Sequence, residues 1–455
     1  MEQEKIFGNH FKTSNLFKKV FKNFSITASS NFIVAFFSVF TLFYNSNSLG
    51  PKLFGVLALY TVSVTVFNRL FGLDMWQQVI KFGGYAYFHK KYNSLRNIFV
   101  YCLLSEFFFS ALSFLGANLF LYLVYLYYGF SDEYLFYGQI YSVALLFKFS
   151  DTSTGMLRLT NRFNVLAYLN ILNSLIYLIG SAFFWYNKSQ FINYIILFTT
   201  ISVLFNSTII LLTLLYWKLD KLPPLYHANL KDKKLIKNIN IFSFIGWLTS
   251  TINVMKNSFD LYIIGIFLDV SASGTYKFAT SIASSVLKIS TPLQQVIFPE
   301  ISKMAAKKQN HKLKKILLDI FSLAGLIILM VNILSLSFAD LTVGIIGGDK
   351  FNSATIPLIL LVFAFSVRSS GFFIRPVLIN CIGHMVFLKS ILYPFIIFVP
   401  VLLFGVIEYG VIGACIAHIV FDILLTIYAL EKINNYFKIR LSNIDFSYKR
   451  FFKKK

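Results

Sequence analysis

Apolar runs of about twenty residues or more, separated by short polar segments, follow one another along almost the whole chain. A bilayer has about 30 Å of hydrocarbon, and an α-helix needs roughly 20 apolar residues to cross it. The pattern therefore predicts an all-α integral membrane protein with twelve transmembrane helices. The runs are 24–44, 53–73, 98–128, 134–153, 164–186, 191–216, 241–267, 275–298, 316–346, 356–379, 386–407 and 410–430.

A repeated tetrapeptide suggests that the first six runs and the last six are copies of one unit. QQVI occurs at 77–80, just after the second run, and again at 294–297, at the end of the eighth. Each copy is followed by a basic segment and then by one of the two unusually long runs, 98–128 and 316–346. A six-plus-six duplication explains these coincidences together.

The composition supports the membrane class. The chain is 57% hydrophobic and only 13% charged, which leaves too few polar residues to cover a water-facing surface. The three cysteines, Cys102, Cys381 and Cys415, lie among apolar residues without metal-ligand spacing, so we expect them to be packing residues.

The net charge of +23 is distributed by side of the membrane. The segments expected on one side hold 32 of the 42 Lys and Arg, whereas the loops on the other side hold only Lys52, Lys188 and Lys350. The positive-inside rule makes the basic side cytoplasmic, and an even number of helices puts both termini there. The basic residues therefore set the orientation of the chain in the membrane and attract anionic lipid headgroups. They do not indicate nucleic-acid binding. The basic segments are 1–23, 74–97, 154–163, 217–240, 299–315, 380–389 and 431–455.

These observations predict five parts. They are a cytoplasmic segment at 1–23, a six-helix bundle at 24–216, a cytoplasmic linker at 217–240, a second six-helix bundle at 241–430 and a basic cytoplasmic tail at 431–455. The sequence contains no G-x-x-x-x-G-K-[ST] loop and no HExxH, paired CxxC or GxSxG motif. We therefore expect no enzyme activity and no bound cofactor.

Several runs carry polar residues at helical spacing. Residues three or four positions apart share one helix face, so such a series predicts a polar stripe. Ser and Thr in these stripes often only join helices to each other. The eighth run has Lys277, Ser281, Ser284, Lys288, Thr291 and Gln295. Other stripes are Thr27, Asn31, Ser38 and Asn45; Thr61, Thr65, Asn68, Arg69 and Gly72; Ser243, Ser250, Asn253, Asn257 and Asp260; and Arg368, Gly371, Phe372 and Arg375.

Cations inside the runs are more informative than hydroxyl groups. Each costs about 2.5–3.5 kcal/mol at the bilayer centre, so it must face a partner or a wet cavity. Lys148 has a structural partner in Asp151 one turn away, and cations near helix ends can reach the headgroups. A set of interior cations favours an anionic cargo, and phosphate suits them best. The seven are Arg69, Lys148, Lys256, Lys277, Lys288, Arg368 and Arg375.

Asp260 shares a face of the seventh run with Asn253 and Asn257. A carboxylate among amide oxygens inside a membrane is a candidate site for coupling Na⁺ or a proton to transport. The alternative is that Asp260 only pairs with Lys256 on the same helix.

One block resembles the bacterial polysaccharide flippases. In FDLYIIGIFLDVSASGTYKFATSIASSVLKISTPLQQVIFPEISKMAAKK, at 259–308, an Asp precedes IIG, a G-x-Y opens the next helix, and F-P-x-x-S-K ends it. Similar to the same family are LGPKLFGVLALY at 49–60, GGDKFNSATIPLILL at 347–361 and YGVIGACIA at 409–417. The superfamily also contains multidrug exporters and peptidoglycan-lipid flippases.

The resemblance implies two six-helix bundles that form a V around a central cavity, with alternating access, in the bacterial inner membrane. It implies that the cargo is an undecaprenyl-pyrophosphate-linked oligosaccharide for O-antigen or capsule synthesis, moved from the cytoplasmic to the periplasmic leaflet. Polysaccharide polymerase and chain-length machinery are the implied protein partners.

With this cargo, Lys277, Lys288 and Arg69 are the first candidates to bind the pyrophosphate. Eleven residues separate the two lysines, or about 16 Å along a helix, so they act at different depths. Lys256, Arg368 and Arg375 are further candidates.

Two other functions stay open. A multidrug exporter of the same fold is the first, although exporters of cationic drugs are expected to have acidic cavities. A membrane glycosyltransferase or polymerase is the second, and the short external loops count against it.

The charge distribution generates a topology prediction. Cysteines introduced at Lys233 and Lys308 should resist a membrane-impermeant thiol reagent in intact cells, because both lie in segments predicted to be cytoplasmic. A cysteine at Lys188, in a predicted external loop, should react. Labelling of either cytoplasmic position from outside would overturn the map.

Overall fold

The computed structural model describes residues 13–129, 131–256, 258–288, 290, 294, 297, 301, 304 and 310–437. Within these residues the chain forms helices joined by short connections, and it has no β-strand. Eight helical segments in the described part are long and apolar enough to cross a membrane. The all-α membrane class is therefore confirmed, and the count of twelve spanning helices stays a prediction.

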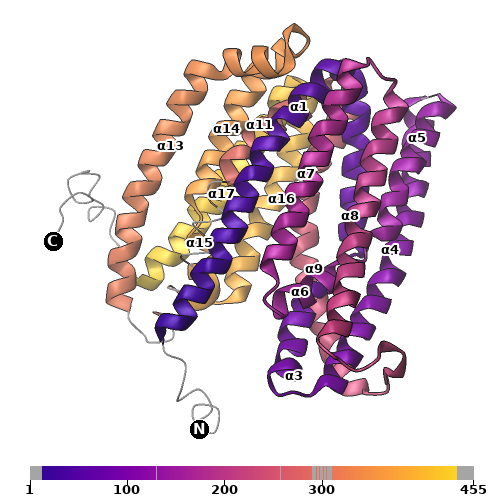
Figure 1. Ribbon diagram of the computed structural model, residues 1–455. Helices are drawn as coiled ribbons and strands as arrows, with labels where there is room; N and C mark the ends of the chain where they lie inside the picture. Colours follow the sequence, from indigo (N-terminus) through magenta and orange to yellow (C-terminus); the bar gives the residue numbers. More distant parts are fainter. Residues whose placement is uncertain are drawn as a thin grey trace.

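The first half of the chain contributes the indigo to magenta helices of Figure 1. They are α1 (Thr13–Phe71), α2 (Met75–Gln78), η1 (Val79–Gly83), α3 (Gly84–Phe88), α4 (Tyr92–Tyr128), α5 (Asp132–Ser142), η2 (Val143–Phe147), α6 (Asp151–Leu159), α7 (Phe163–Tyr186) and α8 (Phe191–Leu219), followed by the short turn η3 (Leu225–His227).

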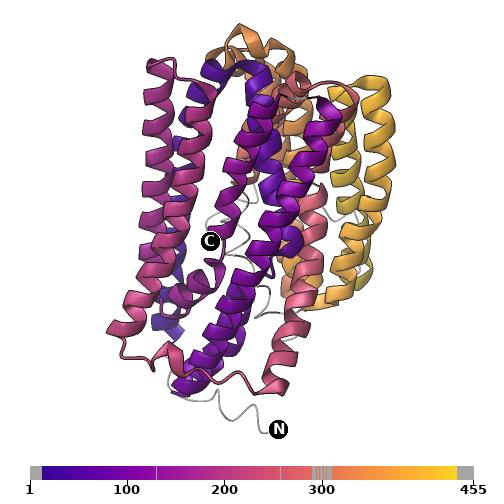
Figure 2. The ribbon, with the colours of Figure 1, turned by 90° about the vertical axis from the view of Figure 1, so that its right-hand side faces the viewer.

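The second half contributes the salmon to yellow helices. They are α9 (Lys233–Lys256), α10 (Phe259–Phe267), α11 (Val270–Ala283), α13 (Asn310–Gly347), η4 (Asp349–Ala354), α14 (Thr355–Ser370), α15 (Ile374–Val377), η5 (Leu378–Ile382), α16 (His384–Tyr409) and α17 (Val411–Phe437). The two groups of helices lie on opposite sides of the molecule in Figure 2.

Helix α1 contains the first two apolar runs as two legs. The break lies at Gly50, which has a φ of 64°, a positive value that glycine adopts without steric cost. Pro51 follows it and cannot continue the helical hydrogen bonds. The first leg packs against α7, and the second reaches across to α11 of the other half. Thus α1 contacts both groups of helices.

The fourth apolar run is not the continuous helix that its hydropathy predicts. Helix α5 passes into the turn η2, and a new helix, α6, begins at Asp151. The buried Glu106 of α4 accepts hydrogen bonds from the backbone N–H groups of Asp151 and Thr152, each at 3.0 Å. Free N–H groups at a helix start favour an acceptor, so a residue from a different helix stabilises this break.

Two more predicted runs are also interrupted. The seventh is divided between α9 and α10 after Lys256, and the tenth ends as a regular helix at Ser370. The remaining part of the tenth run forms α15 and η5.

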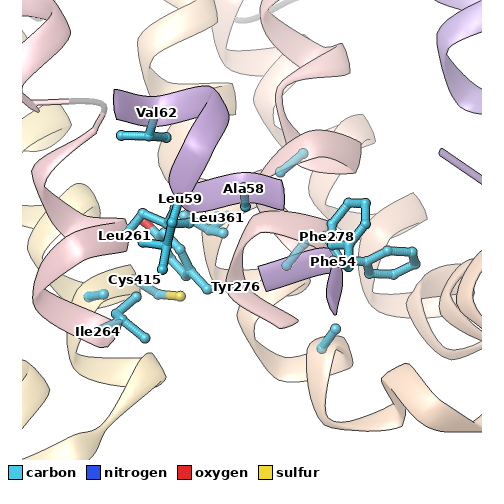
Figure 3. Close-up of a cluster of buried hydrophobic side chains, with 14 of the residues drawn as sticks. Phe54, Ala58, Leu59, Val62, Leu261, Ile264, Tyr276, Phe278, Leu361 and Cys415 are labelled. Carbon is cyan, nitrogen blue, oxygen red and sulfur yellow. The ribbon is translucent and has the colours of Figure 1, made fainter. Parts of the chain in front are cut away.

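Both ends of the second leg of α1 contact the second half of the chain. Near Gly50, Ser46 and Asn47 donate hydrogen bonds to the backbone oxygen of Ile346, at 3.0 and 2.7 Å. Near the other end, the Trp247 indole donates to the backbone oxygen of Leu70 at 2.7 Å. An apolar core lies between them, with side chains from α1, α10, α11, α14 and α17 in contact (Figure 3).

The two halves approach each other closely at a reciprocal glycine contact. A Cβ atom added at Gly55 would clash with the backbone oxygen of Val270, and one added at Gly274 would clash with that of Pro51. Gly55 and Gly274 are separated by as many residues as Pro51 and Val270. The contact is therefore the same on both sides, as at a local two-fold axis. The two QQVI copies are 217 residues apart and these glycines 219, so the duplication stays a prediction.

This contact predicts the effect of adding one methyl group. Gly55→Ala and Gly274→Ala should each destabilise the protein by about 1–3 kcal/mol, because neither backbone oxygen can move without moving its helix. The measurement is thermal unfolding of the purified protein in detergent. Gly344→Ala on α13 is the matched control, since nothing lies within 4 Å of its added Cβ, and it should be neutral or stabilising. Equal melting temperatures for all three variants would contradict the prediction.

Candidate functional site: a cationic cavity between the two halves

A cavity of about 410 Å³ lies between the two halves. The first half contributes both legs of α1, with side chains from α5, α7 and α8. The second half contributes α11, residues 284–288 and the end of α13. The polar side chains of the wall are Ser38, Thr41, Asn45, Thr61, Tyr141, Tyr177, Lys277, Ser281, Ser284, Ser285 and Lys288.

Two of the predicted substrate-binding cations, Lys277 and Lys288, line this cavity together. Ser281 and Ser284 line it between them, so the stripe predicted for the eighth run faces one space. Thr291 and Gln295 of that stripe lie outside the described residues. The described wall includes no Asp or Glu, so the cavity is positively charged.

The hydroxyl groups of the wall mostly present acceptors. Ser38, Thr41 and Ser281 donate their protons to backbone oxygens of their own helices, at 2.6, 3.0 and 2.7 Å. Their lone pairs are then the groups available to a ligand. Asn45 adds a buried side-chain oxygen with no hydrogen-bond partner among the described residues. The cavity thus offers acceptors for hydroxyl groups and ammonium donors for an anion.

Tyrosine hydroxyls from the first half complete the wall. Tyr141 lies 3.2 Å from the Thr61 hydroxyl, and Tyr177 donates to the backbone oxygen of Phe198 at 3.3 Å. Neither tyrosine belongs to the polar stripes predicted from the sequence. A polar side chain in the middle of an apolar run was the available signal, but tyrosine also occurs in ordinary packing.

Arg69 does not join the two lysines. It pairs with Asp74 and lines a separate small pocket with Lys148 and Asp151. Asp74 lies five residues after Arg69, just beyond the end of α1, so its carboxylate reaches back to the guanidinium. In contrast, no acidic residue follows Lys288 before Glu300.

Lys256 is paired inside the second half and does not line the cavity. Its ammonium lies 3.0 Å from Asp422 of α17 and 3.9 Å from the centre of the Phe421 ring. The side chains of Lys256 and Asp422 are 1% and 0% exposed. The alternative that Asp260 only pairs with Lys256 is therefore wrong, because the Lys256 ammonium donates its hydrogen bond to Asp422 of α17.

Asp260 has partners of its own. Its carboxylate accepts hydrogen bonds from the Tyr276 hydroxyl at 2.6 Å and the Leu261 backbone N–H at 2.7 Å, and its Oδ2 lies 2.8 Å from His418 Nε2. The ion-coupling hypothesis also named Asn253 and Asn257. The side chain of Asn253 and all of Asn257 lie outside the described residues.

Arg368 and Arg375 also lie away from the cavity. Arg368 of α14 is half-buried and close enough to Lys256 to act on it electrostatically. Arg375 is exposed, with its guanidinium 5.6 Å from the centre of the Phe387 ring. Their roles in substrate binding stay predictions.

The sequence matches the family described as polysaccharide biosynthesis protein over residues 20–305, which is more than half of the chain. This chain belongs to the polysaccharide biosynthesis protein family. The resemblance found in the sequence is thereby confirmed. Among relatives, the inner membrane protein YghQ of Escherichia coli (strain K12) is 21% identical over 305 residues, which cover 65% of this chain and 83% of YghQ.

Solved structures confirm the fold of this family member. One match is an inward-facing multidrug resistance MATE family transporter of the MOP superfamily, with a TM-score of 0.69 and 13% identity. The match covers 90% of this chain and 99% of the transporter chain. Another match is the lipid II flippase MurJ in an inward closed conformation, with a TM-score of 0.62 and 16% identity. This match covers 88% of this chain and 87% of the MurJ chain.

The buried ion pair predicts a double-mutant result. Lys256→Met should destabilise this family member by about 3–5 kcal/mol, because it leaves Asp422 as a buried charge without its partner. Adding Asp422→Asn should recover much of the loss, since the second charge is then also removed. The coupling energy comes from unfolding four proteins in detergent: Lys256→Met, Asp422→Asn, the double variant and the wild type. Losses that simply add would show that the two residues do not interact.

Proposed function

We propose that this protein is a flippase that moves an undecaprenyl-pyrophosphate-linked oligosaccharide from the cytoplasmic to the periplasmic leaflet of the inner membrane. The cargo is a repeat unit for surface polysaccharide, O-antigen or capsule. The observation that carries the proposal is the cavity between the halves, with Lys277 and Lys288 on one wall and no acidic side chain among its described residues. Membership of the polysaccharide biosynthesis family and the likeness to the lipid II flippase MurJ support it.

The cavity chemistry suits both parts of such a headgroup. A sugar carries many hydroxyl groups, and each costs about 2–7 kcal/mol to remove from water unpaired. Oxygen atoms of Ser38, Thr41 and Asn45 can accept hydrogen bonds from these hydroxyl groups. The pyrophosphate needs cationic donors, and an ion pair at 4 Å contributes up to about 4 kcal/mol at intermediate dielectric, before desolvation. Lys277 and Lys288 supply those donors.

The proposal includes the transport cycle. Twelve membrane-crossing segments form two six-helix bundles, which open the cavity first to the cytoplasm and then to the periplasm. Both termini lie in the cytoplasm, and the proposed protein partners are the polysaccharide polymerase and the chain-length machinery. Those partners act on the periplasmic side, once the cargo has crossed. The protein itself is a transporter and not an enzyme.

A multidrug exporter is the second candidate. The shared fold with a MATE transporter, at a TM-score of 0.69, is the observation behind it. The cavity argues the other way, because a cationic drug would meet two ammonium groups and no carboxylate in the described wall. Unchanged surface polysaccharide with raised drug sensitivity, after clean deletion of the gene, would favour the exporter.

The flippase proposal predicts a deletion phenotype. Surface polysaccharide should be lost while lipid-linked repeat units accumulate on the cytoplasmic leaflet, in a strain with no redundant flippase. The measurements are surface staining and extraction of the lipid-linked intermediates. Normal polysaccharide after clean deletion would contradict the proposal.

Substitutions in the cavity test the role of charge. Lys277→Ala and Lys288→Ala should each reduce complementation of the deletion strain about ten-fold or more, because each removes a phosphate contact. Lys288→Arg should keep much activity, and Ser284→Ala should cost less than Lys288→Ala. Lys218→Ala, at an exposed end of α8, is the control for a lost lysine. All variants are compared at matched protein levels, and full complementation by both cavity alanine variants would remove the lysines from the binding site.

A further inference from the structure

A second polar cluster lies outside the cavity, inside the second half of the molecule. It brings together Lys256 of α9, Asp260 of α10, Tyr276 of α11, and His418 and Asp422 of α17. All five side chains are buried. Tyr276 lies among apolar side chains that include Leu261 and Cys415 (Figure 3). A polar cluster of this kind is costly inside a membrane protein, so its protonation has large structural consequences.

The hydrogen bonds define the charge state of this cluster. Asp260 accepts from Tyr276 and from the Leu261 N–H, and this arrangement suits an ionised carboxylate. Its third contact, at 2.8 Å, then requires His418 to carry a proton on Nε2. In a neutral imidazole the other nitrogen, Nδ1, is an acceptor.

Two buried atoms of the cluster have no partner among the described residues. They are Nδ1 of His418 and Oδ2 of Asp422. Both are acceptors in the state just described, so they cannot bond to each other. The two residues are four positions apart on α17 and therefore neighbours on one helix face. A proton on Nδ1 would convert that atom into a donor, and Asp422, one turn along the same helix, offers a free acceptor oxygen.

We infer that His418 is a proton-binding site, and that a proton taken up from water at Nδ1 links Asp260, His418 and Asp422 into one chain of hydrogen bonds. No bond breaks other than that of the proton to water. The added link ties α10 to α17 and, through Asp422 and Lys256, to α9. Its connection to transport rests on the proposed function, in which the proton would be the coupling ion.

The charged groups around His418 come from each neighbouring helix. Lys256 of α9 and Arg368 of α14 are cationic, Asp260 of α10 is anionic, and Lys277 of α11 acts on Asp260 electrostatically. Tyr276 of α11 and Cys415 of α17 are neutral, and α16 contributes the aromatic ring of Phe398, 5.3 Å from the imidazole centroid. His418 therefore has two carboxylates near it, Asp260 in contact and Asp422 one turn away. They offset the repulsion of the cations when the proton binds.

Hydrogen exchange of the purified full-length protein in lipid nanodiscs tests the site without any transport assay. After correction for the intrinsic effect of pH, amides of α10 and of the middle of α17 should exchange about ten-fold more slowly at pH 5.5 than at pH 8, because an added hydrogen bond to a charged group holds them. Amides of α8 should show no such difference. An equal response in α8, or no response in α10 and α17, would overturn the site even without a variant.

Two substitutions then assign the proton. His418→Gln retains an N–H donor for Asp260 but cannot take up a proton, so it should abolish the pH response. His227→Gln, at an exposed histidine of η3, should preserve it. A response that persists in folded His418→Gln would place the proton elsewhere and refute the assignment.

The coupling is tested separately. In a complemented deletion strain, the rate at which surface polysaccharide reappears should depend on external pH for the wild type and not for His418→Gln. If deletion leaves the polysaccharide unchanged, the proposed function fails while the exchange experiment still decides the proton site. If the exchange experiment succeeds and both proteins show the same pH dependence of transport, the site binds a proton that does not drive the cycle, which refutes the coupling.

Discussion

A charged side chain inside a membrane needs an opposite charge beside it or water around it, because its hydration is lost in hydrocarbon. This constraint separates four of the seven interior cations into two kinds. Arg69 and Lys256 have carboxylate partners, Asp74 and Asp422. Lys277 and Lys288 have no ion pair among the described residues and instead line the cavity between the halves. The paired cations contribute to the structure of each half, and the other two are available to a ligand.

The same constraint makes the two halves chemically unequal although their central contact is symmetric. Gly55 and Gly274 meet the opposite helix in the same way, as two copies of one unit would. Lys288 lies 14 residues after Gly274, and Arg69 lies 14 residues after Gly55. Arg69 has Asp74 shortly after it, whereas Lys288 has no acidic residue near it in sequence. The carboxylate of Asp74 is thus the local difference between Arg69, which is paired, and Lys288, which lines the cavity.

The interrupted helices follow from contacts between segments distant in sequence. The break before α6 is stabilised by Glu106, and the break between α9 and α10 lies between Lys256 and Asp260, whose partners are on α17. In each case a polar side chain lies where a helix ends within an apolar run. A membrane permits such irregular backbone only where protein surrounds it and supplies hydrogen-bond partners. Glu106, Lys256 and Asp260, all buried, lie beside these breaks.

The sequence by itself determined the membrane class, the approximate bounds of α7, α8, α16 and α17, the polar stripe of α11, and the family. Hydropathy and helical periodicity are properties of neighbouring residues along one chain, so they can be read without knowing the fold. Only the tertiary structure decided which cations are paired. Lys256 pairs with Asp422, and Asp260 pairs with His418, although more than a hundred residues of sequence separate each pair. No local pattern marks such a pair, because the two residues come together only when α9 and α10 pack against α17 and α16.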